Sequence, residues 1–197
     1  MSHEPNYASE GYDANGRTER IVELLTTYGE RVGNALVYSS AYLAAIAMAE
    51  VAIAMVLLSL PPNPAPVVVG LVTFAVYTND RGADADTDAV SDPERAAFVR
   101  RHRDTLYLLA SVSYGLAAAV SVLGGPLALA VTLLPGLFWV AYAADWVPEL
   151  APHLRRLKEV LVVNSAVVAL AWATTLTALP VAFTGAAVTP ATGVVFA

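Results

Sequence analysis

Long apolar stretches divide this sequence, and they constrain its fold more than any other feature. Four of them cover residues 34–60, 105–123, 126–144 and 160–183. Each is near or above the roughly 20 residues that a helix needs to cross the hydrocarbon core of a bilayer. A fifth stretch, 65–79, is shorter, and by length alone it fits a re-entrant or buried segment as well as a span. The pattern predicts an all-α integral membrane protein.

The composition agrees with this class. The 197 residues are 57% hydrophobic and only 14% charged, whereas a soluble domain carries about 25% charged residues. The absence of cysteine excludes disulfides, thiolate metal ligands and cysteine nucleophiles. The formal charge of −6 argues against nucleic acid as a partner. Ten of the eleven basic residues are arginine and the N-terminal tail is acidic, a balance that resembles proteins of extreme halophiles.

The positions of the basic residues decide whether 65–79 crosses the membrane. Every Lys and Arg lies in one of three blocks: 17–31, 80–104 and 145–159. Basic loops are retained on the cytoplasmic side, and all three blocks can lie there only if 65–79 is a span. The sequence therefore predicts a multi-pass protein of the cell membrane, with five transmembrane helices in a bundle over 34–184 and a cytoplasmic N-terminus.

The region before the bundle, residues 1–33, is predicted to be an acidic tail followed by a surface helix. Residues 1–17 are polar and expected to be disordered. Between 18 and 31 the apolar side chains recur at helical spacing, which indicates an amphipathic helix on the membrane surface. These side chains are Ile21, Leu24, Leu25 and Tyr28. A helical extension of the first span is the alternative.

The last residues, 185–197, form an uncharged apolar stretch that contains Pro190. This stretch is expected to be a sixth span cut short. Within the first span, Glu50 suggests a function because a carboxylate in hydrocarbon is costly. Two interpretations of Glu50 stay open: it binds a proton or an ion, or it is a neutral acid that is hydrogen-bonded to a neighbouring helix.

An acidic segment, 79–92, follows the second span. On a helix, its residues Asp80, Asp84 and Asp88 would stand above one another at i, i+4 and i+8. Like charges placed so closely destabilise a helix unless a cation lies among them. Clustered carboxylates at a membrane exit can hold Mg²⁺ against a diphosphate, whose oxygens complete the octahedral shell of the ion.

Two other interpretations compete for this segment. The first is a solvated acidic loop of an acid-rich chain. The second is an EF-hand calcium loop, because Asp84, Asp86 and Asp88 match its positions 1, 3 and 5. The EF-hand is excluded because its glycine position holds Ala89 and its bidentate glutamate position holds Arg95.

A longer pattern extends through this segment: an Asn-Asp pair at the end of the second span, aspartates at helical intervals, and then Pro-x-Arg. Its residues are Asn79, Asp80, Asp84, Asp88, Pro93 and Arg95. The pattern resembles the first aspartate-rich motif of the UbiA-type membrane prenyltransferases, Asn-Asp-x-x-Asp-x-x-x-Asp with Pro-x-Arg shortly after. Residues 156–172 also resemble the stretch that leads into the fifth helix of that family. The resemblance covers most of 34–184.

The resemblance implies transfer of a polyprenyl group from its diphosphate to a lipid or aromatic acceptor. Mg²⁺ held by aspartates would neutralise the departing diphosphate. It further implies that Asp80, Asp84 and Asp88 are catalytic and bind the metal, and that Asn79 and Arg95 contact the substrate. The arginines that follow are either further diphosphate contacts or topogenic charges: Arg100, Arg101 and Arg103. Asn34, at the start of the first span, either faces the same cavity or marks the helix entry.

The sequence departs from the family at three points. Asp84 lies one residue later than the family spacing, and Asn164-Ser165 stands where members often have Lys-Asn. The family also has about nine helices and a second aspartate motif after the sixth, so the chain resembles only the first half of that bundle. A non-catalytic fragment, or a subunit completed by a second chain or copy, is therefore the rival hypothesis. An ion carrier that uses Glu50 is a third.

Overall fold

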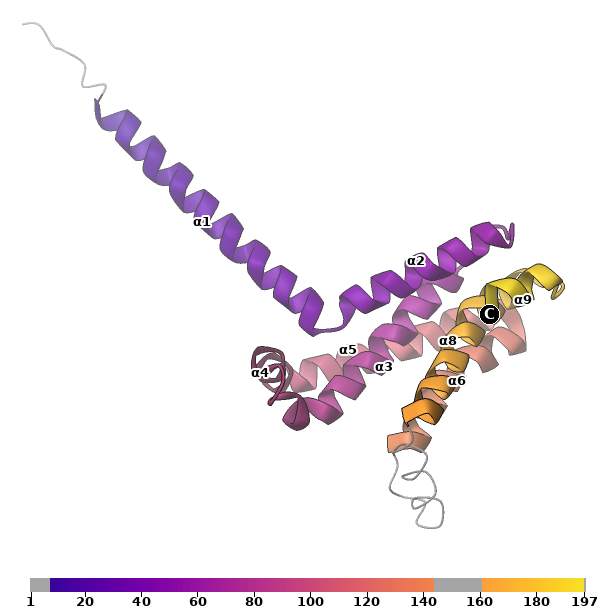
Figure 1. Ribbon diagram of the computed structural model, residues 1–197. Helices are drawn as coiled ribbons and strands as arrows, with labels where there is room; N and C mark the ends of the chain where they lie inside the picture. Colours follow the sequence, from indigo (N-terminus) through magenta and orange to yellow (C-terminus); the bar gives the residue numbers. More distant parts are fainter. Residues whose placement is uncertain (1–7, 144–160, 197) are drawn as a thin grey trace, which may run out of the picture. The chain divides into compact units, whose positions relative to one another are not determined.

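The computed structural model describes residues 8–143 and 161–196, and every regular element in these ranges is helical (Figure 1). The predicted all-α class is confirmed for this part of the chain. The chain forms two compact units, Met1–Tyr38 and Ser39–Ala197. The predicted 145–159 loop lies outside the described residues.

In the N-terminal unit, the described residues form one helix, α1 (Ala8–Tyr38). Residues 8–17, which the sequence predicts to be disordered, are helical, because no proline interrupts them and a glycine costs a helix only about 1 kcal/mol. The four residues of the predicted apolar face, Ile21, Leu24, Leu25 and Tyr28, are each 56–70% exposed. Its contact with a membrane surface stays a prediction.

The predicted first span, 34–60, is not one helix. Residues 34–38 end α1, a turn follows at Ser39 and Ser40, and α2 covers Ala41–Leu57. Ser40 is buried and has a positive φ of 68°, and the carbonyl of Ser39 accepts a hydrogen bond of 2.9 Å from Thr78 Oγ1. The buried Ser40 hydroxyl finds no hydrogen-bond partner in the described part of the chain, so the bond from Thr78 is the contact that holds the turn to the next helix, α3 (Ala65–Asp88).

Four further long helices follow the predicted apolar stretches. They are α3 (Ala65–Asp88), α5 (Arg103–Ser121), α6 (Gly125–Ala143) and α8 (Leu161–Thr184). Three short elements complete the unit: α4 (Pro93–Arg101), the 3₁₀ turn η1 (Val122–Gly124) and α9 (Pro190–Phe196). Within 185–197, the stretch expected to be a sixth span cut short, residues 190–196 form this short helix.

Mostly small and β-branched side chains from α2, α3, α5, α6 and α8 form the main core. Its fully buried members include Val51, Val68, Val69, Ala117, Ala128 and Leu179. Such side chains allow helix backbones to approach closely, as in membrane bundles. The core therefore joins all the long helices of the C-terminal unit that the structure describes.

One continuous helical stretch of the described residues, Arg103–Leu137, is long and apolar enough to cross a membrane: it has 35 residues, and a window of 18 of them has a mean hydropathy of 2.0. A second qualifies only if Gly16–Tyr38 and Ala41–Leu57 are counted together as one broken span. Straight, the first stretch would be about 50 Å long, more than a bilayer core of about 30 Å. It folds back instead, as the 2.9 Å hydrogen bond from Tyr114 Oη to the carbonyl of Leu133 shows.

The turn between α5 and α6 is made at Gly125, whose φ of +81° favours glycine. Farther along α6, Gly136 lies so close to Tyr114 that a Cβ there would overlap the ring and its hydroxyl. The two helices thus pack side by side as an apolar hairpin. This hairpin is the feature that supports membrane association; five crossings and their orientation stay predictions.

Candidate acidic site at the end of α3

The three predicted metal ligands lie on one uninterrupted helix. α3 does not end near residue 79 but continues through Asp80 and Asp84 to Asp88. Asp80 and Asp84 are exposed and Asp88 is half-buried. At a rise of 1.5 Å per residue, neighbouring members of this series are about 6 Å apart along the axis.

Tyr107 of α5 packs against the middle of this acidic segment. A Cβ on Gly82 would lie 2.7 Å from Tyr107 Oη and 2.9 Å from Cε1, so the close approach requires glycine. The Arg103 guanidinium lies over the same ring, 5.4 Å from its centroid. Tyr107 is not predicted from the sequence as part of this site; Gly82, between Asp80 and Asp84, is the one sign of a close neighbour.

α4 begins directly after the acidic segment and is held by a local cap. The Asp92 side chain accepts a 3.1 Å hydrogen bond from the backbone N–H of Arg95, and Pro93 occupies the first turn. Asp is a favoured N-cap residue and Pro a favoured first helical residue. Asp-Pro thus ends the turn after α3 and starts the helix that carries Arg95.

A small apolar cluster holds α4 against the helices beside it. Ala85 from α3, Val99 from α4 and Leu106 from α5 are buried together, with Phe98 packed against them. This cluster is separate from the main core. It fixes which face of α4 turns towards the acidic end of α3.

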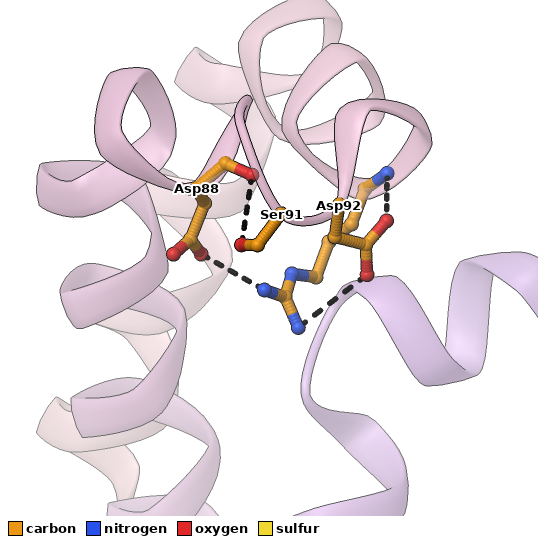
Figure 2. Close-up of polar contacts among 4 residues, drawn as sticks. Asp88, Ser91 and Asp92 are labelled. Atoms are coloured by element: carbon orange, nitrogen blue, oxygen red, sulfur yellow. Dashed lines mark hydrogen bonds and ion pairs between the residues drawn. The ribbon is translucent and has the colours of Figure 1, made fainter.

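The docking of α4 brings Arg95 to the aspartates. Arg95 Nη2 lies 3.1 Å from Asp88 Oδ2, and Nη1 lies 3.6 Å from Asp92 Oδ2. Figure 2 shows the two carboxylates on either side of the guanidinium, with the Ser91 hydroxyl donating to the backbone carbonyl of Asp88 at 3.3 Å. The Arg95 guanidinium thus lies at the end of the acidic series. Its positive charge offsets the repulsion between carboxylates that are stacked on one helix.

Arg95 retains a hydrogen-bond donor that these carboxylates do not use. Its Nε is buried and finds no acceptor in the described part of the chain. A buried donor without a partner is costly, and an anionic ligand would satisfy it. Arg100, one of the three following arginines, lies 3.7 Å from Asp86 Oδ1, but this aspartate is 97% exposed and the contact adds little stability.

The other predicted contact residues are placed differently. Asn79 Nδ2 donates a 3.0 Å hydrogen bond to the carbonyl of Ala75 on its own helix. Asn34 is exposed on α1 and belongs to the N-terminal unit, so its position in a shared cavity stays a prediction. Asn164 and Ser165 lie on α8.

The aspartates fit a metal only if it is bound jointly with an anionic ligand. Their hard oxygens suit Mg²⁺, yet no group of three or more acidic or histidine side chains converges on one point within the described residues. Asp84 is exposed and has no ion pair or hydrogen bond to that part of the chain. Diphosphate oxygens would have to complete the shell of an ion held there.

The described structure thus shows a helical protein with one stretch long and apolar enough to span a membrane, and with an acidic segment beside an arginine. No protein-family model matches the chain, and no match is found among curated proteins or solved structures. The resemblance to UbiA-type prenyltransferases rests on the motif residues themselves.

Proposed function

We propose that this chain is a UbiA-type prenyltransferase homologue that binds a polyprenyl diphosphate and Mg²⁺ at the acidic end of α3. The observation that carries the proposal is the arrangement of Asp80, Asp84 and Asp88 on one helix, with Arg95 held beside the last of them. Carboxylates for a metal and a guanidinium for phosphate oxygens are the two kinds of group that a metal–diphosphate complex requires.

Each residue has a distinct part in this proposal. Asp80 and Asp84 present exposed oxygens to the metal, and Asp88 holds Arg95 in place until the diphosphate arrives. The guanidinium of Arg95 then donates to phosphate oxygens, including from its buried Nε. When bound, Mg²⁺ supplies positive charge that stabilises the departing diphosphate. The acceptor is a lipid or an aromatic compound.

The polyprenyl chain of such a substrate belongs in the bilayer, so the proposal includes a membrane bundle of five helices. Large apolar side chains point outward from α2, α5 and α6, among them Val56, Leu108 and Leu127. Exposed apolar surface of this extent favours contact with lipid over water. The positive-inside rule places the acidic site on the cytoplasmic side.

The topology can be tested because the native chain has no cysteine. Ala83 is exposed in the acidic segment, and Pro62 is exposed in the turn after α2. Each can therefore be replaced by a single reactive cysteine, in the variants Ala83→Cys and Pro62→Cys. In intact cells, a membrane-impermeant maleimide should label Pro62→Cys and should label Ala83→Cys only after lysis. Labelling of Ala83→Cys before lysis would contradict the topology.

The activity is tested with farnesyl diphosphate as the probe and the full chain in detergent. We expect binding that requires Mg²⁺ and that weakens at least tenfold, about 1.4 kcal/mol, in Asp84→Asn. Asp104→Asn, an exposed aspartate in the first turn of α5, is the matched control and should bind as the native chain does. Equal binding by Asp84→Asn, with or without metal, would rule the site out.

A second candidate is a non-catalytic fragment or a subunit that needs a second chain or copy. It is favoured by the absence of a converging group of three metal ligands in the described ranges. This candidate predicts diphosphate binding without prenyl transfer by the isolated chain. Transfer by the purified chain to a lipid or aromatic acceptor would exclude it.

A further inference from the structure

A hollow lined by three helices lies within the C-terminal unit. Its volume is about 350 Å³, and its walls come from α2, α3 and α8. The lining includes apolar side chains, two aromatic rings and one carboxylate: Leu43, Ile46, Leu176, Tyr77, Trp172 and Glu50. None of the aspartates of the acidic site lines it.

The two aromatic rings are fixed relative to each other although they are far apart in the sequence. Trp172 Nε1 donates a hydrogen bond of 3.3 Å to Tyr77 Oη. The ring centroids are 6.4 Å apart, with an angle of 28° between the planes. The indole N–H is used in this bond, whereas the Tyr77 hydroxyl accepts it and keeps its own proton. Both rings also contribute aromatic surface to the lining.

Glu50 is the only charged residue among those lining the hollow. It is exposed and makes no ion pair or hydrogen bond with the residues that the structure describes. This step rests on the proposed membrane bundle: at the depth of the hydrocarbon, a carboxylate is stable only with a compensating charge or hydrogen-bond donors. The hollow therefore has one negative charge to be matched and no cation of its own in the lining.

We propose that this hollow binds a lipophilic organic cation with a quaternary or tertiary ammonium group. Aromatic faces attract such cations electrostatically, and a nearby carboxylate supplies the counter-charge. An inorganic divalent ion is a poor match, because Glu50 alone offers two oxygens where Mg²⁺ or Ca²⁺ takes six or more. The volume is near the lower limit for small-molecule sites, about 300 Å³, which favours a compact ligand.

The test compares two ligands of the same shape on the native full chain, solubilised in an uncharged maltoside detergent. Benzyltrimethylammonium carries the charge, and neopentylbenzene replaces its nitrogen by carbon. Equilibrium dialysis against protein-free micelles corrects for partition into detergent. We expect saturable binding of the cation at least tenfold tighter than that of the neutral compound. Equal affinity for the two would overturn the proposal without any variant being needed.

Variants then assign the charge to the hollow. Glu50→Gln keeps the shape of the side chain and should weaken cation binding at least tenfold, and Trp172→Phe should weaken it several-fold. Glu23→Gln, a surface residue of α1, is the matched control and should not change binding. Circular dichroism confirms equal helix content. Native affinity in Glu50→Gln would place the cation elsewhere and overturn the proposal.

Discussion

The two halves of α3 differ in nearly every respect although one helix contains both. The first half, residues 65–78, contributes eight of the buried residues of this helix: Ala65, Val68, Val69, Gly70, Val72, Thr73, Ala75 and Thr78. In the second half, residues 79–88, only Ala85 is buried. The position of the first half is therefore determined by packing in the main core. The position of the second half is determined by charge and by contacts with α4 and α5.

This difference separates stability from chemistry along one element. A segment with few buried apolar contacts opens more readily than a packed one, so the acidic half depends on its small cluster with α4 and α5. Its side chains are consequently accessible to a ligand while its backbone stays attached to a rigid core. Substitutions in the two halves should have effects of different size, and the predictions below rank them.

The largest effect is expected in the packed half. Val69→Ala removes two methyl groups from a side chain that is 0% exposed, and should lower the free energy of unfolding by about 2 kcal/mol. Val67→Ala makes the same change at a position that is 48% exposed, and should lower it by less than about 0.5 kcal/mol. Denaturant titration in detergent, followed by circular dichroism, measures both. Equal losses of unfolding free energy in the two variants would contradict the difference between the buried and the exposed face of this half.

A smaller loss is expected where the acidic half meets α5. Gly82→Ala gains about 1 kcal/mol of helix propensity, but the new methyl displaces the Tyr107 ring at a cost of about 1–3 kcal/mol. The net change should be a destabilisation of about 1 kcal/mol. Gly115→Ala, on α5 with open space around it, should instead stabilise by about 0.5–1 kcal/mol. Stabilisation by both substitutions would contradict the close approach of Tyr107.

Loss of the N-terminal cap of α4 should lower the free energy of unfolding by less than Val69→Ala and Gly82→Ala do. Asp92→Ala removes the acceptor for the backbone N–H of Arg95 and should destabilise by roughly 0.5–1 kcal/mol. Ser91→Ala, one residue earlier, removes only a hydroxyl bond within an exposed turn and should change stability by less than about 0.5 kcal/mol. Thermal unfolding of the two variants side by side gives the comparison.

The smallest effect on stability is expected at the arginine. Arg95→Lys keeps the charge beside Asp88 but loses the planar donor fork. Because both partners are partly exposed, stability should fall by less than about 0.5 kcal/mol. Binding of farnesyl diphosphate with Mg²⁺ should nevertheless weaken several-fold. A large stability loss with unchanged binding would make Arg95 a structural residue only.

The apolar stretches of the sequence predict three helices of the C-terminal unit closely. α5, α6 and α8 begin and end within two residues of the predicted stretches 105–123, 126–144 and 160–183, because an apolar run between polar residues is a local property. The spacing of the aspartates also predicts that they share one face if the segment is helical, but not that the helix continues through them.

Which residues meet depends on tertiary packing. Three contacts join segments that are distant in the sequence: the hydrogen bond from Thr78 to Ser39 beside the break after α1, the Tyr107 ring against Gly82, and the hydrogen bond from Trp172 to Tyr77. The continuation of α3 past residue 79 also depends on Ala85 packing under α4 and α5. The periodicity of a sequence shows which face of a helix is apolar but not which helix covers that face. The partner is decided when whole helices pack against one another at close-packed density.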